Sequence, residues 1–163
     1  MDDRIARAKW LLENVKHGAM ATVNEDGSPH NTPYFFMSST DLSKLYWGSH
    51  KNSIHSQNIL RTGKLFVVLY GELEGGGLYI QAENGRVAQD NELDEALARH
   101  NDLRKRIANK ESLSKEYYLE SEQDMWIADV TQLWVNKADR YDNGRLREDL
   151  RHEISASDIG EIL

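Results

Sequence analysis

The sequence contains no cysteine, which excludes disulfide bonds, thiolate metal ligands and cysteine nucleophiles. It also has no apolar run close to the roughly 20 residues that cross a bilayer, and its Met-Asp-Asp-Arg start is unlike a secretion signal. We therefore expect a cytoplasmic protein without a membrane span. A length of 163 residues suits one domain, residues 1–163, with a hydrophobic core large enough to be stable without disulfide bonds.

Basic residues are in the minority, with 20 Lys and Arg against 27 Asp and Glu and a formal net charge of −7. Sequence-independent nucleic-acid binding relies on many cations spread over a broad face. We therefore expect no nucleic-acid partner, although a small basic pocket remains compatible with this charge.

Acidic residues are almost missing from one long span. Between Ser28 and Gly71 the only acid is Asp41, where the average composition predicts about seven. Inside this span, residues 49–56 (SHKNSIHS) gather hydroxyls, imidazoles and one ammonium group just before a predicted helix start, where unpaired N–H groups favour anions. An ordinary helix start capped by Ser53 or Asn52 explains the same loop. The missing carboxylates favour a phosphorylated ligand.

Apolar periodicity and turn residues predict the order of the elements. Predicted helices cover residues 2–17, ended by Gly18; about 53–62, ended by Gly63; 91–109; and part of 112–122, capped by Ser112 or Ser114. Predicted strands cover 19–23, 30–37, 45–47, 65–70 (buried on both faces), 78–82, and 126–136 with a turn at 131–132. Residues 137–144 are expected to be a loop, and 145–154 a charged edge strand before a C-terminal tail.

Six or seven strands without βαβ alternation predict a mainly β protein, either a barrel or a strongly curved sheet, with peripheral helices. The three glycines at 75–77 lack the spacing of a dinucleotide fingerprint and are read as a turn.

Four segments carry a family resemblance: GAMATVNEDGSPHNTPYFF, LYWGSHKNSIHSQNI, LFVVLYGELEGGGLYIQAE and DVTQLWVNKADRYDNG. In this order and spacing, over residues 1–144, they resemble the pyridoxamine 5′-phosphate oxidase-like, FMN-binding split-barrel family. The resemblance implies a six-stranded antiparallel split β-barrel with peripheral helices. The residue patterns assign residues 1–18 to the N-terminal helix and 145–163 to the edge strand and tail. The resemblance also implies a homodimer with FMN at the subunit interface.

The resemblance assigns the cofactor contacts by position. It gives the FMN phosphate to Ser53 and His55, helped by Lys51. The flavin ring would meet Asn31, Thr32 and Pro33, with Tyr46 and Trp47 nearby, and Trp134 would approach from the second subunit. One departure concerns the phosphate, because Ile54 and His55 stand where the oxidase proper has an Arg-Lys pair. The phosphate would then be held more by hydroxyl and N–H donors than by fixed charge.

A second departure concerns the substrate. The C-terminal substrate signature of the oxidase is not recognisable, and only Arg140 lies where its arginine is expected, so we do not assign vitamin B6 oxidation. A flavin performs hydride and electron transfer itself, so no catalytic side chain needs to be visible. Two functions remain: an FMN-dependent oxidoreductase of an unknown small molecule, and a non-catalytic flavin-binding, storage or sensing protein. A related flavin or deazaflavin is also left open.

Other interpretations of these residues compete with a cofactor site. His50 and His55 lack metal-ligand spacing and accompanying carboxylates, so no metal is expected. No G-x-S-x-G segment occurs, which removes the usual basis for a hydrolase. The residues Trp47, Trp126 and Trp134 are also suited to a core, and Asn31 and Thr32 to a solvent-facing strand.

Overall fold

The structure, a computed structural model, describes residues 3–71, 76–142 and 145–162, without the side chains of 107–108, 137–142 and 145–149. The helices are α1 (Asp3–Asn14), α2 (Ile54–Thr62), α3 (Asp90–Ala108), α4 (Lys115–Glu120) and α5 (Ala156–Ile159). The strands are β1 (His17–Val23), β2 (Pro29–Phe35), β3 (Met37–Ser38), β4 (Lys44–His50), β5 (Leu65–Tyr70), β6 (Gly77–Val87), β7 (Gln123–Asp142) and β8 (Arg145–Ile154).

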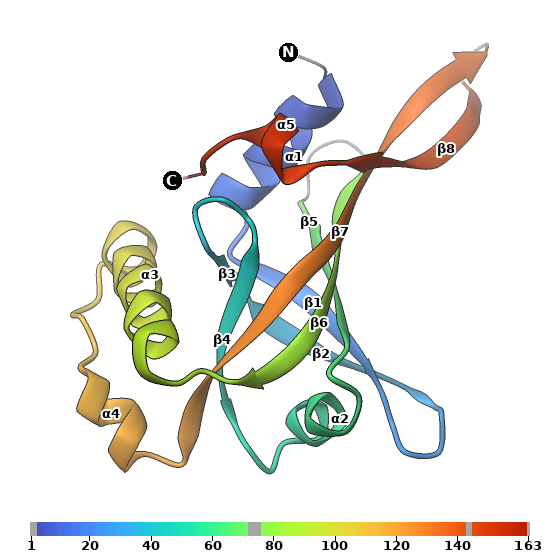
Figure 1. The fold of residues 1–163 in the computed structure, drawn as a ribbon. Helices are drawn as coiled ribbons and strands as arrows, with labels where there is room; N and C mark the ends of the chain where they lie inside the picture. Colours follow the sequence, from blue (N-terminus) through green and yellow to red (C-terminus); the bar gives the residue numbers. More distant parts are fainter. Residues whose placement is uncertain (1–2, 72–75, 143–144, 163) are drawn as a thin grey trace.

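All the strands belong to one antiparallel sheet in the order β2-β1-β5-β6-β7-β4-β3, with β8 paired to β7 beyond this path. The two ends of this order, β2 and β3, are separated in the chain by Phe36 alone. The sheet must therefore curl until its ends meet, which gives the open barrel visible in Figure 1. The barrel is split where β2 diverges from β4, because no ladder joins these two strands in the described residues.

The predicted mainly β architecture, a split barrel with peripheral helices, is confirmed, but the sheet has eight strands instead of six. The strands beyond these six are the short β3, which was not predicted, and the outer β8, which is the predicted edge strand 145–154. The predicted hairpin over 19–23 and 30–37 is β1–β2, the helix ended by Gly63 is α2, and the strand 65–70 is β5. Ser114 caps α4 by accepting a hydrogen bond from the Tyr117 backbone N–H at 3.4 Å.

Two boundaries were predicted wrongly. The first helix ends at Asn14, and Gly18 lies inside β1. A Cβ at position 18 would lie 2.5 Å from the carbonyl oxygen of Val68, so glycine is needed there for the approach of β1 to β5. The predicted turn at 131–132 is absent, and β7 continues through the predicted loop at 137–142. A register shift opposite Gln81 and Ala82 absorbs the extra residue as a bulge.

The prediction that β5 is buried on both faces is also wrong. Its residues alternate between buried and partly exposed, so only one face points into the barrel. The predicted start at Asp2, Gly75 of the glycine turn, residues 143–144 of the predicted loop and the Arg140 side chain lie outside the described residues.

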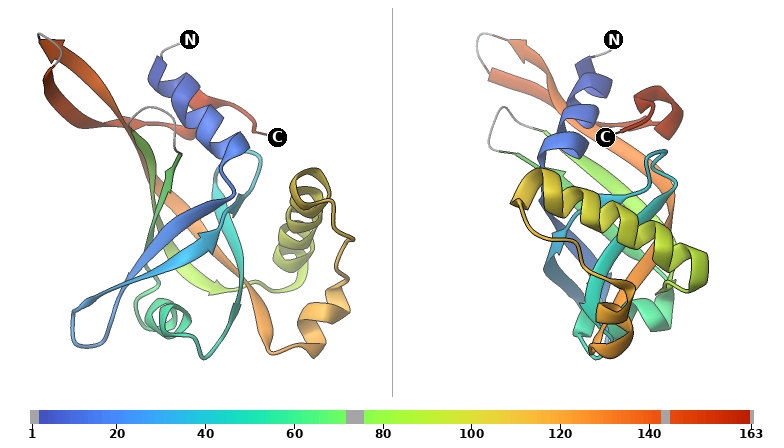
Figure 2. Two further views of the ribbon diagram at one scale, coloured as in Figure 1. Left: turned by 180° about the vertical axis from the view of Figure 1, so that it is seen from behind. Right: turned by 90° about the vertical axis from the view of Figure 1, so that its left-hand side faces the viewer.

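The core consists of two clusters separated by the wall of the barrel. Trp47 and Trp126 lie in the interior cluster, with nearly parallel rings whose centroids are 6.1 Å apart. Tyr46, next to Trp47 on β4, lies in the outer cluster. There it is grouped with Met125 of β7 and Leu93 of α3, the helix that covers this side of the barrel. Figure 2 shows α3 lying along this outer wall. The alternation of β4 therefore places the neighbours Tyr46 and Trp47 on opposite faces of the sheet.

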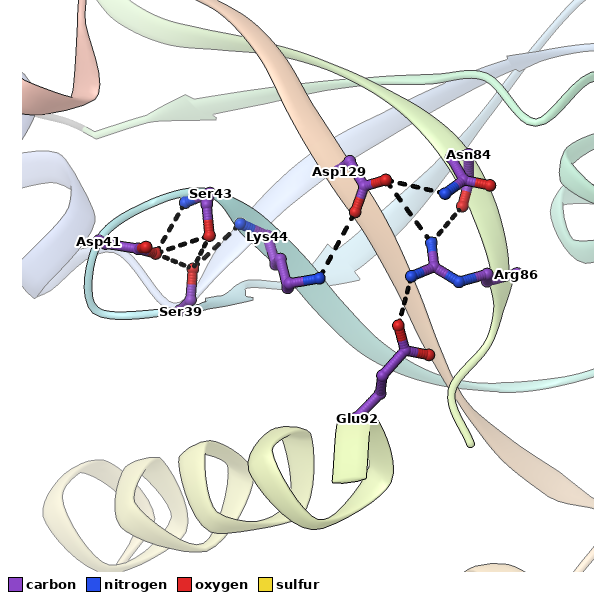
Figure 3. A network of polar contacts seen from close by, with 8 residues as sticks. All are labelled: Ser39, Asp41, Ser43, Lys44, Asn84, Arg86, Glu92 and Asp129. Carbon is purple, nitrogen blue, oxygen red and sulfur yellow. Dashed lines mark hydrogen bonds and ion pairs between the residues drawn. The ribbon is translucent and has the colours of Figure 1, made fainter. Parts of the chain in front are cut away.

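A polar network ties α3 to the barrel (Figure 3). Arg86 on β6 forms an ion pair with Glu92 on α3 and lies 3.8 Å from Asp129 on β7. Asp129 also lies 3.7 Å from Lys44 on β4 and accepts a hydrogen bond from Asn84 at 2.8 Å. The network joins three strands and a helix on the side of the barrel that is covered by α3.

Asp41, the only acid between Ser28 and Gly71, has a structural role. Its carboxylate accepts hydrogen bonds from Ser39 Oγ at 2.6 Å and from Ser43 Oγ and the Ser43 backbone N–H. These bonds, with Ser39 first, lower the pKa of Asp41 and fix the turn before β4. The loop of residues 49–56 lies at the opposite end of β4, so Asp41 lies away from it.

Candidate functional site

The loop after β4 leads directly into α2. Ser53 occupies the N-cap position in an extended conformation, but its hydroxyl makes no capping bond to the helix. Gly63 ends the helix in the left-handed conformation (φ 68°) and donates its N–H to the Ile59 carbonyl at 2.7 Å. The predicted helix boundaries are confirmed. The Ser53 side chain is left for another contact, and the first turn of α2 contains no acid.

Ser53 belongs to a hydroxyl–imidazole cluster, which consists of Ser49, Ser53, His55 and Ser56. His55 Nε2 lies 2.7 Å from Ser49 Oγ and 3.2 Å from Ser53 Oγ. Ser53 Oγ donates to Ser56 Oγ at 2.8 Å, and Ser56 Oγ donates to Ser49 Oγ at 3.2 Å. Ser56 is fully buried, and Ser49 is 7% exposed. The cluster is therefore held inside the structure and positions His55.

The electrostatics of the cluster come from burial and from one neighbour. Burial lowers the pKa of His55, and the nearby imidazole of His30 lowers it further. The rings of His30 and His55 are nearly parallel, at 13°, with centroids 6.5 Å apart. Carboxylates reach the loop from outside the span 28–71: Glu122 Oε2 lies 3.0 Å from Nε2 of His50, and Asp124 on β7 is the ladder partner of Ser49. The absence of acids from residues 28–71 did not predict a carboxylate at the loop, because Glu122 comes from outside this span, at the junction of α4 and β7.

A cavity of about 110 Å³ opens in the split between β2 and β4. Its lining consists of Met20, Thr32, Pro33, Tyr34, Phe35, Trp47, Gly48, Ser49 and His55, with no carboxylate among them. Trp47 is 3% exposed, and its indole N–H has no hydrogen-bond partner among the described residues. A buried donor of this kind costs free energy unless an acceptor meets it. The cavity thus combines an anion-compatible cluster with an unsatisfied donor.

The structure brings several of the predicted site residues together. Thr32, Pro33, Trp47 and His55 line the cavity, and Ser53 contacts His55. The side chains of Asn31 and Lys51 are exposed beside it, and the Lys51 carbonyl accepts a hydrogen bond from Gln57.

Two predicted site residues lie elsewhere. Tyr46 is buried under α3, where burial and the Glu95 carboxylate raise its pKa. Trp134 lies on the outer face of the barrel against Phe66, with ring centroids 6.0 Å apart. Neither side chain lines the cavity of this chain. Trp126, for which a core position was predicted, is fully buried in the interior cluster.

Several residues at the site were not in the predicted set of cofactor contacts, among them the polar residues His30, Ser49 and Ser56. His30 shares a face of β2 with Thr32, so the two-residue period of a strand could have identified it. Ser49 and Ser56 are separated by the whole loop, and only the turn of the chain into α2 brings them together. Asn58, on α2, donates to Thr22 at 3.0 Å and to Asn24 at 2.9 Å, which anchors the helix to the β1–β2 hairpin.

A larger hollow of about 440 Å³ lies over β1, β5 and β6, lined by Val23, Phe66 and Gln81 among others. Its lining includes Thr22 and Thr62 but no imidazole, and its cation Lys64 is paired with the carboxylate of Glu83, so its chemistry favours a phosphate less. No group of three or more His, Asp or Glu side chains that could hold a metal ion is found in the described part of the chain. Among the helices described, none is long and apolar enough to cross a membrane.

Several known structures share the fold of this chain. A heme binding protein from Mycobacterium smegmatis superposes with a TM-score of 0.65 at 15% identity, over 98% of this chain and 60% of that one. A relative of general stress protein 26 from Clostridium acetobutylicum, in the pyridoxinephosphate oxidase family, has a TM-score of 0.60 at 10% identity, over 94% and 96%. An F420 reductase has a TM-score of 0.56 at 17% identity, over 77% and 94%. At these identities, the similarity shows a shared fold.

No curated protein matches the chain. The family model described as pyridoxamine 5′-phosphate oxidase matches residues 6–140, from α1 into the far part of β7. The match includes the cavity between β2 and β4 and all four members of the hydroxyl–imidazole cluster. The chain therefore belongs to the pyridoxamine 5′-phosphate oxidase family.

Proposed function

We propose that the protein binds FMN in the split between β2 and β4 and is an FMN-dependent oxidoreductase of a small molecule. The observation that carries the proposal is the hydroxyl–imidazole cluster at the start of α2, beside a cavity without carboxylates. The phosphate would meet Ser53, His55 and the free N–H groups of the first turn of α2. Lys51 would supply one mobile cation from the exposed loop.

The chain fits the phosphate without the Arg-Lys pair of the oxidase proper. Ile54, at the first of these positions, is 58% exposed and contributes no donor. His55, at the second, lies within hydrogen-bond distance of two hydroxyls. Such a site binds through several neutral donors and one titratable imidazole, so its affinity depends on geometry more than on fixed charge.

When bound, FMN supplies hydride and electron transfer. The residues of the chain bind and orient it. Trp47, whose indole N–H is buried without a partner among the described residues, lines the cavity together with Thr32 and Pro33. Ligand sites usually measure roughly 300–1,000 Å³, so a cavity of about 110 Å³ encloses only part of the cofactor. The rest of the cofactor must lie in the open split, where a second subunit can cover it.

The cofactor proposal is tested by titrating the purified apo-protein with FMN and following flavin fluorescence. We expect saturation at one FMN per chain at micromolar concentration, and weaker binding of riboflavin, which lacks the phosphate. Hemin and F420 serve as competitors, because two of the structural neighbours are a heme binding protein and an F420 reductase. Tight binding of either one with no response to FMN would overturn the assignment.

Turnover separates the two functions that fit this site. An oxidoreductase should show reduction of bound FMN by NADH or NADPH and reoxidation by an acceptor well above the rate of free FMN. A storage or sensing protein would bind FMN and show neither.

We further propose that the unit is a homodimer whose interface completes the site. Phe66, Tyr79 and Trp134 form an aromatic group on the outer face of β5, β6 and β7, each only partly buried. Arg151 from β8 lies over the Tyr79 ring, 3.9 Å from its centroid. A partly exposed aromatic group on a sheet is typical of an interface. It would place Trp134 against the cofactor held by the partner.

The dimer proposal predicts that Trp134→Ala weakens FMN binding about 10-fold, as expected for loss of an aromatic stacking contact. Trp10→Ala is the matched control, because Trp10 is 38% exposed on α1 and should leave FMN affinity unchanged. Sedimentation of the apo- and holo-proteins should show that FMN stabilises the dimer. A monomer that keeps full FMN affinity at nanomolar concentration would refute the shared site.

A further inference from the structure

Two histidines converge on the start of α2 from different elements. His30 projects from β2, and its ring lies nearly parallel to that of His55, with centroids 6.5 Å apart. The His30 ring is half-buried and makes no hydrogen bond to another described residue. Its nitrogens are therefore available to a ligand that reaches His55.

The hydroxyls beside His55 have a defined direction. Ser53 donates to Ser56, and Ser56 donates to Ser49. Each hydroxyl has one proton to donate, and that of Ser49 has two acceptors within reach, the His50 carbonyl at 3.4 Å and His55 Nε2 at 2.7 Å; the shorter contact favours His55. In this arrangement His55 is neutral and accepts a hydrogen bond, in agreement with a pKa lowered by burial and by His30. All three hydroxyl protons are then used inside the cluster.

This step rests on the proposed phosphate site and deepens it. We propose that His30 is a further phosphate-binding residue, and that a bound phosphate is recognised by the His30–His55 pair with uptake of a proton from solvent. We also infer that the hydroxyl chain then reverses, so that Ser53 donates to the phosphate. The ligand class is a phosphate monoester, and binding changes no covalent bond.

The reversal follows from the donor inventory of the groups. A protonated imidazole donates from both nitrogens, so His55 Nε2 would donate to Ser49 instead of accepting from it. Ser49 would then donate to Ser56, and Ser56 to Ser53, across the same distances. The Ser53 proton becomes free to point at a phosphate oxygen. The negative charge of the phosphate offsets the repulsion between the two imidazoles.

Other charged groups near α2 do not substitute for His30. Helix α2 packs against β1, β2 and β6, and His30 is the titratable group that β2 turns toward His55. On β6, Glu83 is paired with Lys64 beyond the far end of α2, and Asp26 of the hairpin turn is held by Ser28. In the loop, His50 contacts Glu122, and Lys51 is exposed; on β7, Asp124 is the ladder partner of Ser49 and is partly buried. On β1, His17 lies at the end of the strand that is farther from His30.

The test is FMN affinity at two pH values. From about pH 5.5 to about pH 8, the wild-type affinity should fall about 10-fold, because proton uptake is lost. The second ionisation of the phosphate, with a pKa of about 6, makes the ligand more negative at the higher pH and therefore favours binding there. Because the variants His30→Gln and His55→Gln lack the proton uptake, they should bind FMN equally well or better at the higher pH. His17→Gln, at an exposed histidine away from the cluster, should keep the wild-type slope.

Ser56→Ala tests the reversal separately. The Ser56 side chain positions its neighbours and does not touch the phosphate, so breaking the hydroxyl chain should weaken FMN binding several-fold at the lower pH and little at the higher pH. A loss that is equal at both values would mark a merely structural role and would overturn the reversal.

Histidine NMR with millimolar inorganic phosphate tests the pair independently of the flavin. Phosphate should raise the imidazole pKa of both His30 and His55. If it does so while FMN fails to bind, the flavin assignment is wrong and the phosphate site stands. If FMN binds with the same affinity at both pH values and neither pKa rises, the proton uptake is refuted. No response to either ligand refutes it as well.

Discussion

Replacing Trp126 by alanine is expected to lower the free energy of unfolding by about 3–5 kcal/mol, the usual range for removing a large buried aromatic side chain. Trp126 is fully buried, stacks on Trp47 and donates its indole N–H to the Ser49 carbonyl at 3.1 Å. The substitution leaves a cavity in the barrel and also frees that carbonyl. Chemical denaturation followed by circular dichroism measures the loss.

Trp126→Phe separates packing from the hydrogen bond. It keeps an aromatic ring against Trp47 but leaves the Ser49 carbonyl without its donor, so about 1–3 kcal/mol should be lost. If phenylalanine costs as much as alanine, ring packing is not the main contribution. Because Ser49 belongs to the hydroxyl–imidazole cluster, both variants should also weaken FMN binding.

The second large effect concerns ligand affinity. Ser53→Asp should weaken FMN binding about 100-fold, because a carboxylate would face the phosphate at the start of α2, where even at an effective dielectric constant near 20 two like charges about 4 Å apart repel by about 4 kcal/mol. Ser53→Ala removes one hydroxyl and should cost about 10-fold. Fluorescence titration of the three proteins gives the ranking.

Ser53→Asn is the matched control for this ranking, because it has the shape of aspartate without its charge. Ser53 occupies the N-cap position of α2, where both Asp and Asn are favoured, so neither variant should lower the stability of the fold. Equal losses for Asp and Asn would show that the phosphate lies elsewhere.

The sequence predicted best where local chemistry decides the structure. Gly63 ends α2 because the left-handed C-cap favours glycine, and the turn between β1 and β2 follows from its glycine and asparagine. The single strand β7 was missed because Thr131 and Gln132 are compatible with either a turn or a bulge. Pairing with β6, which is distant in the chain, decides between them.

In the candidate site too, local sequence predicted some residues, and contacts between distant elements decided the position of others. His55 and Ser53 could be placed in a phosphate loop from local composition and from the family resemblance. Tyr46 was placed near the flavin because it precedes Trp47, but the alternation of β4 turns it under α3. The strand period could have placed His30 on the same face as Thr32, but its contact with His55 joins β2 to α2 across the split of the barrel. Sequence order does not show such a contact.

Strand β7 also has a consequence for the order in which the molecule can fold. It pairs with β4 through residues 123–129, with β6 through 126–135 and with β8 through 133–142. Without it, the sheet falls into two pieces, β2-β1-β5-β6 and β4-β3. During synthesis, the facing edges of β4 and β6 therefore remain open until β7 leaves the ribosome, and they can pair with other chains until then. Barrel closure waits for contacts of long sequence separation, so we expect folding to be slow for a protein of this size.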